Sequence, residues 1–176
     1  IPEDENGRFT FLETLREFAY EKLRSSGELE NIRRRHFEYY LKFLKTAKSN
    51  GQKGSDQFLW LSRIEHDYNN LRLALAWGIE KRERVDLVMD FGISIHYFWL
   101  TRSYIREARY WLSRILALDE TPSAARANLL RFESDYSSAQ GDYTTAQRLE
   151  EEAMNISKNL GDEAGIYFSM DGMAML

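Results

Sequence analysis

Three histidines are the first residues whose spacing could support chemistry. His36, His66 and His96 recur 30 residues apart, and imidazole is a common metal ligand. A zinc site needs three or four ligands, each held in place by further hydrogen bonds. The sequence has no His-x-x-x-His, no Glu-x-x-His and no cysteine. We therefore interpret the histidines as satisfied core residues or surface residues, and we expect no metal and no cofactor.

Three short segments combine residue types that occur in catalytic or phosphate-binding motifs. Gly51–Ser55 contains Gly, Lys and Ser without the Gly-x-x-x-x-Gly-Lys-Ser/Thr spacing that cradles phosphates. Arg33–Arg35 would spread around a helix, so solvated charges are favoured over a phosphate contact. Glu150–Glu152 is interpreted as a solvated helix face, and no serine stands in a Gly-x-Ser-x-Gly motif. We predict that the chain is not an enzyme.

Composition narrows the class of protein further. The 176 residues are 43% hydrophobic and 30% charged, which is typical of a globular domain. The net charge of −4 argues against nucleic-acid binding, because phosphates attract clustered Lys and Arg. The acidity is uneven, since residues 119–163 contain ten acidic and four basic side chains. No run of about 18 apolar residues exists, so no membrane span is expected. The absence of cysteine fits a reducing compartment, and we expect a cytoplasmic protein.

Helical periodicity extends over nearly the whole sequence, and no segment alternates with period two over the length of a strand. The sequence therefore predicts an all-α fold. Ser25-Ser26-Gly27 and Gly161-Asp162 are expected to end helices, and Thr121-Pro122 to begin one. The predicted helices cover residues 10–24, 28–48, 56–65, 69–81, 85–100, 104–118, 123–140 and 144–160, with a linker at 49–55 and a last, truncated helix after Asp162.

An internal repeat with an offset of 38 residues is the most informative pattern. It aligns the segment 102–108 with 140–146, so that Ala108 matches Ala146 and Trp111 matches Leu149. The repeating unit is a helix, a short turn and a second helix. Such a hairpin cannot bury its apolar face alone, so neighbouring hairpins must stack.

The second copy of this unit resembles a tetratricopeptide repeat (TPR). The resemblance rests on Gly141-Asp142-Tyr143 and on the small residues Ala146 and Ala153, because that family places small residues where its two helices pack closely. Glu133 and Glu150 depart from the pattern, since they stand where the family prefers large apolar side chains. The resemblance implies antiparallel helical hairpins stacked into a TPR-like right-handed superhelix.

Three phrases in the N-terminal half resemble a second group of proteins. They are FTFLETLREFA at 9–19, RHFEYY at 35–40 and EHDYNNLRLALAW at 65–77. These are similar to the region that follows the nucleotide-binding core in bacterial STAND-type ATPase regulators of the LuxR or AfsR type. The resemblance implies two regions: an N-terminal helical segment at 1–50, which ends a winged-helix-like region, and a TPR-like repeat domain at 51–176 that is truncated at its C-terminus.

A function follows from the two resemblances together. They imply a non-catalytic sensor or scaffold arm of a multidomain, signal-responsive transcriptional regulator. Such an arm would bind a protein, a peptide or a small-molecule effector and contact other domains of its own chain, without touching nucleic acid or membrane. The alternative is an independent TPR adaptor that mediates protein–protein interaction.

The same resemblance predicts where a partner or effector would bind, because the first helices of stacked TPR hairpins line a concave groove. The mixture of side chains expected there suits a peptide or a modest organic effector. Packing of this face against a neighbouring domain is the alternative. With the 38-residue offset, the predicted groove consists of Asp90, Ile93 and Tyr97, then Asn128, Arg131 and Asp135, then Ile166, Ser169 and Met173.

Overall fold

The computed structural model describes residues 12–51 and 57–176, and within these residues every regular element is an α-helix. The predicted all-α class is therefore confirmed for the described part of the chain. The nine helices found there are α1 (Glu13–Ser26), α2 (Leu29–Gly51), α3 (Gln57–His66), α4 (Tyr68–Lys81), α5 (Val85–Thr101), α6 (Ile105–Leu116), α7 (Ala124–Ala139), α8 (Tyr143–Leu160) and α9 (Glu163–Ala174).

Local signals in the sequence set most helix ends. Gly27 and Gly161 follow α1 and α8 with φ of 76° and 68°, a left-handed conformation that glycine adopts without a clash from Cβ. Asp142 and Asp162 precede α8 and α9, and each carboxylate accepts a hydrogen bond from the backbone N–H three residues later. The helix stops predicted at the two glycines are confirmed.

The predicted start of α7 at Thr121-Pro122 is wrong by two residues. The backbone N–H of Thr121 donates to Asp119 Oδ1 at 2.8 Å, which holds this segment in a turn. Ser123 is the N-cap instead, because its Oγ accepts a hydrogen bond from the Arg126 N–H at 3.1 Å. Pro122 therefore lies before the helix and not in its first turn.

Helix α2 buries its predicted apolar stripe only in part. The spacing of apolar residues over 28–48 predicts a stripe of Leu29, Ile32, His36, Tyr40, Phe43 and Ala47; Tyr40 and Ala47 are buried, Ile32 is exposed and the other three are half-buried. Phe37, Leu41 and Leu44 beside this stripe are also buried, because the contacts of α2 with α3, α4 and α5 decide which part of its broad apolar face enters the core. The linker predicted over 49–55 is wrong for residues 49–51, which belong to α2; residues 52–56 lie outside the described part.

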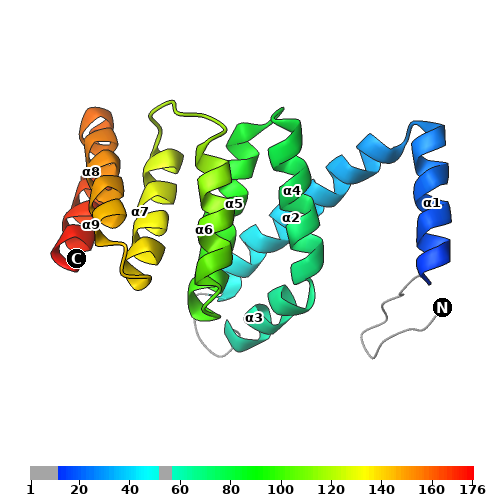
Figure 1. Ribbon diagram of the computed structural model, residues 1–176, viewed down its shortest axis with the longest axis horizontal. Helices are drawn as coiled ribbons and strands as arrows, with labels where there is room; N and C mark the ends of the chain where they lie inside the picture. The colour runs from blue at the N-terminus through cyan, green and yellow to red at the C-terminus, as the bar shows by residue number, and fades with distance from the viewer. Residues whose placement is uncertain (1–11, 52–56) are drawn as a thin grey trace.

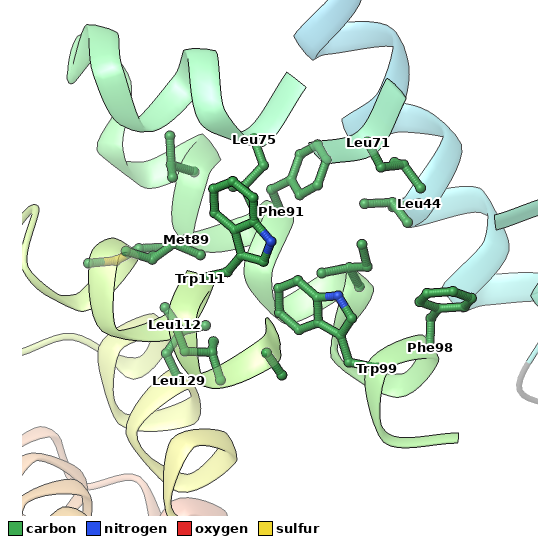
Figure 2. Close-up of a cluster of buried hydrophobic side chains, with 14 of the residues drawn as sticks. Leu44, Leu71, Leu75, Met89, Phe91, Phe98, Trp99, Trp111, Leu112 and Leu129 are labelled. Atoms are coloured by element: carbon green, nitrogen blue, oxygen red, sulfur yellow. The ribbon is translucent and has the colours of Figure 1, made fainter. Parts of the chain in front are cut away.

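One continuous apolar core runs from α2 to α8. At its centre the rings of Phe91, Trp99 and Trp111 pack with leucines from α2, α4 and α6, as Figure 2 shows. Trp99 is almost fully buried and its indole N–H donates to the Tyr68 hydroxyl at 2.8 Å, so the polar edge of the ring is satisfied. Helix α2 shares this core with α3–α5, and the division of the chain at residue 50 stays a prediction.

The helices from α5 onward stack as antiparallel pairs along the long axis of the molecule (Figure 1). Helix α7 contacts both α5 and α6 of the preceding pair, and α9 likewise contacts both α7 and α8. The matched small residues Ala108 and Ala146 are fully buried. Ser134 Oγ on α7 donates to the Ala146 backbone oxygen at 2.9 Å, which requires a close approach of α7 and α8. The predicted close packing at Ala146 is confirmed.

Helix α1 lies at the opposite end of the molecule from α9 (Figure 1). It contacts α2 near the turn at Gly27, and none of its residues is buried. Leu15 and Phe18 on α1 are exposed.

Candidate functional site

The first predicted layer of the groove lies on α5 and faces α2 and α3. Lys45 on α2 donates to the Asp90 carboxylate at 2.5 Å. Gln57 on α3 donates to the hydroxyl of Tyr97. Ile93 is half-buried against the main core. Side chains of α2 and α3 therefore already form hydrogen bonds with the polar groups of this layer.

The second and third layers meet through Arg131, which is buried between α7 and α9. Its guanidinium donates to Asn128 Oδ1 at 2.6 Å, to the Gly165 backbone oxygen at 3.3 Å and to Ser169 Oγ at 3.4 Å. Ser169 is fully buried. Three of the predicted groove residues are thus brought together, but Arg131 and Ser169 join the helices to each other and are not open to a ligand.

Four predicted groove residues keep accessible surface on the α7–α9 face. Asp135 is exposed, and Asn128, Ile166 and Met173 are half-buried. Desolvation by neighbouring protein atoms nevertheless raises the pKa of the Asp135 carboxyl group to about 6, an effect that the Arg131 charge partly offsets. This part of the face offers one carboxyl group, one amide and two apolar side chains.

Glu150 is a buried carboxyl group that the sequence interpretation placed on a solvated face. Of the Glu150–Glu152 run, only Glu151 is exposed, whereas Glu152 accepts hydrogen bonds from Arg126. Desolvation raises the pKa of Glu150 to about 7, and its Oε2 has no hydrogen-bond partner within the described residues. Helix α8 turns this position towards α7 and α9, so the interpretation of this residue as solvated is wrong.

A signal for this burial was present in the sequence. Glu133 and Glu150 both occupy positions where the resembled repeat carries large apolar side chains, and both are buried. Burial also raises the pKa of Glu133 to about 7, although Arg109 donates to it at 3.3 Å. The departure of Glu133 and Glu150 from the resembled pattern therefore placed two carboxyl groups at buried positions.

His96 packs inside the fold. Its ring stacks on Phe132 with centroids 3.5 Å apart, and its Nδ1 lies 3.0 Å from the Tyr136 hydroxyl. Burial lowers the pKa of His96 to about 4, so its ring is neutral at pH 7. Among residues 12–51 and 57–176, no group of three or more His, Asp or Glu side chains is arranged to hold a metal ion.

A cleft that the sequence did not predict lies between α1, α2 and α4 and has a volume of about 1050 Å³. Leu73 on α4 and Ile32 on α2 are exposed there. The α1 side chains that face it are mostly charged, among them Glu17 and Glu21. The cleft therefore combines apolar surface from α2 and α4 with a charged wall from α1.

Comparison with known proteins relates the chain to a segment of large regulators. Over 109 residues it is 33% identical to three mycobacterial proteins that are each named "Putative HTH-type transcriptional regulator": Rv0890c and MT0914 of Mycobacterium tuberculosis and Mb0914c of Mycobacterium bovis. The match covers 62% of this chain but only 12% of each relative. No protein-family model matches the chain, and no solved structure matches it significantly.

The structure also bears on the prediction that no segment crosses a membrane. None of the helices in the described ranges is long and apolar enough to span a lipid bilayer.

Proposed function

We propose that the chain is a non-catalytic binding arm of a multidomain transcriptional regulator of the STAND type, similar to LuxR- or AfsR-like proteins. In this role it receives a protein or a small effector in the cytoplasm and acts as a sensor or scaffold. The observation that carries the proposal is the relation of the chain to a segment of regulators named for a DNA-binding motif. The parts of such a protein that bind DNA or ATP would lie outside this segment.

The packing of the helices supports a scaffold role. Each first helix from α7 onward contacts both helices of the preceding pair, and the equivalent small residues are buried at the pair interfaces. This is how stacked repeats build an extended surface from short-range contacts. We assign the stack to a TPR-like right-handed superhelix.

The chemistry of the exposed residues supports binding rather than catalysis. On the α7–α9 face the accessible groups are Asn128, Asp135, Ile166 and Met173. An amide, a carboxyl group and two apolar side chains suit recognition of a peptide or a small organic molecule. We propose no cofactor and no nucleic-acid contact for this segment.

An in-frame deletion of residues 57–176 from the chromosomal gene tests the proposal. We expect a defined set of transcripts to change and to return to the parental level on complementation with the wild-type gene. Complementation with Glu151→Gln, which alters one exposed carboxylate of α8, serves as the matched control and should also restore them. A transcript profile identical to the parent would contradict the regulator proposal. If a protein complex were lost while transcripts stayed unchanged, the independent TPR adaptor would be the better assignment.

A further inference from the structure

A pocket of about 320 Å³ lies between α2, the C-terminal end of α4 and the start of α5. These three helices pack against one another in the middle of the described chain (Figure 1). Phe37, Gly78 and Val88 line the pocket and are buried, and Trp77 and Leu87 line it and are half-buried. The pocket therefore has an apolar floor, and its volume is at the lower end of the range of small-molecule sites.

Packing within the fold fixes this floor. The Phe37 ring stacks on Phe91 with centroids 5.6 Å apart, and it lies 5.7 Å from the Trp77 ring. At Gly78 a Cβ atom would come within 2.7 Å of Phe37 Cε2 and within 3.1 Å of Val88 Cγ2, so the absence of a side chain at Gly78 permits this packing. The floor is thus formed by the protein alone, as in most small-molecule sites.

The rim of the pocket carries charges of both signs. The charged residues that line it are Arg34, Glu38, Lys81, Glu83 and Arg84. Two of the three cations already have close partners in the fold, because Lys81 lies 2.7 Å from Glu30 and Arg84 lies 2.9 Å from Asp86. The groups that remain for a ligand are therefore on α2.

Glu38 and Arg34 are these groups. Glu38 forms no hydrogen bond or ion pair within residues 12–51 and 57–176. Arg34 has only a distant partner there, since its Nη2 lies 3.7 Å from Glu83 Oε2, beyond the reach of a hydrogen bond. The two side chains of this pair are 56% and 61% exposed, so the pair contributes little to stability and Glu83 stays hydrated if a ligand replaces it.

The spacing of Arg34 and Glu38 places opposite charges together over the floor. They lie four residues apart on α2 and hence on one side of the helix, yet they do not pair with each other. An uncharged apolar ligand would desolvate both groups without replacing their hydrogen bonds to water, which is unfavourable. A phosphate would bring negative charge next to Glu38 and Glu83. A ligand with one positive and one negative group satisfies both α2 side chains.

We propose that this pocket binds a free amino acid with a large apolar side chain. The apolar side chain lies on the floor beside Phe37 and Trp77, the ammonium group donates to Glu38, and the carboxylate accepts from Arg34. The proposal rests on the proposed function of a sensor arm and names the chemical class of its effector.

An NMR chemical-shift titration of the isotopically labelled 176-residue chain with L-phenylalanine tests the proposal. The backbone signals of Gly78 and Val88 should shift and saturate, with a Kd of about 1 mM or tighter, the range expected for so small a ligand. Two analogues test the charges: 2-phenylethylamine lacks the carboxylate and 3-phenylpropionate lacks the ammonium group. Each should bind at least about tenfold more weakly than L-phenylalanine.

Variants assign each charge to its partner. Glu38→Gln should weaken binding of L-phenylalanine at least about tenfold and leave binding of 3-phenylpropionate no weaker, whereas Arg34→Gln should weaken L-phenylalanine and leave 2-phenylethylamine no weaker. A general loss of structure would not give this crossed pattern. Arg35→Gln is the matched control, because Arg35 is exposed on α2 and does not line the pocket. Circular dichroism of each variant verifies that the helices remain.

Three results would overturn the proposal. The shifts could fail to saturate up to about 10 mM L-phenylalanine, which would exclude a specific site. An analogue with a single charge could bind as tightly as the amino acid. L-phenylalanine could bind both variants as well as the wild type. Since the deletion experiment reads transcripts and not binding, a failure here together with altered transcripts would reject this pocket and leave the binding arm intact.

Discussion

The substitution Glu150→Gln tests how the C-terminal hairpin holds a carboxyl group in its interior. Glu150 is 1% exposed, and desolvation raises its pKa from 4.5 to about 7. A raised pKa means that the folded chain keeps the proton while the unfolded chain has released it. Between about pH 4.5 and 7 the free energy of unfolding therefore decreases as pH rises, and above pH 7 the full cost of the buried charge is present.

The size of the effect follows from the shift. A difference of about 2.5 pKa units corresponds to an upper limit of about 3 kcal/mol, and relaxation of the site reduces it to about 2 kcal/mol. The isosteric glutamine carries no charge, so Glu150→Gln should raise the melting temperature at pH 8 by roughly 4–8 °C. At pH 5 the wild-type carboxyl group is already protonated in the folded state, and the variant should melt with the wild type.

Differential scanning calorimetry at pH 5, 6, 7 and 8 measures this profile. Glu151→Gln is the matched control: it removes a carboxylate from the neighbouring, exposed position of the same helix and should leave the pH profile as in the wild type. An equal gain at pH 5 and pH 8 would show that the charge of Glu150 is not the cause. A loss of stability at pH 8 would show that the Glu150 carboxylate stabilises the buried Arg131 by more than its own desolvation costs.

Further predictions concern packing and chemistry. Ala146→Leu places three extra carbons at a fully buried contact and should lower stability by about 1–3 kcal/mol in urea unfolding, whereas Ala139→Leu at an exposed position of α7 should change it little. Gly78→Ala should cost about 1 kcal/mol despite the better helix propensity of alanine, because its Cβ would approach Phe37 Cε2 to 2.7 Å; an unchanged urea midpoint would show that this ring yields freely. The purified chain should neither release phosphate from ATP nor contain stoichiometric zinc, and turnover above a mock purification, or zinc by elemental analysis, would contradict the non-catalytic assignment.

Much of the helical framework was predictable because its signals are local. Apolar periodicity placed the helices from α3 to α9 to within a few residues, and Gly27 and Gly161 marked the ends of α1 and α8. The 38-residue offset found the equivalence of Ala108 and Ala146, and both are buried as small residues at helix contacts. Each of these signals acts over a few residues of chain, through backbone conformation or the size of one side chain.

The candidate site was predicted less well, because burial depends on neighbours that are distant in sequence. The 38-residue offset correctly placed Asn128, Arg131 and Ser169 near one another, but it contains no information about burial, and Arg131 and Ser169 are buried. It also contains no information about the partners that α2 and α3 supply for Asp90 and Tyr97.

The sequence alone therefore determined where the helices form and which residues of successive hairpins correspond. Tertiary packing decided which part of the broad apolar face of α2 enters the core, so that Leu44 is buried and Ile32 is exposed. It also decided that Glu150 lies inside and Glu151 outside, although the two are adjacent and chemically identical. An isolated helix exposes all of its sides to water. A side becomes buried only where other elements pack against it. Phe168 on α9 and Leu130, 38 residues earlier on α7, show the same dependence, since the first is 56% exposed and the second 1%.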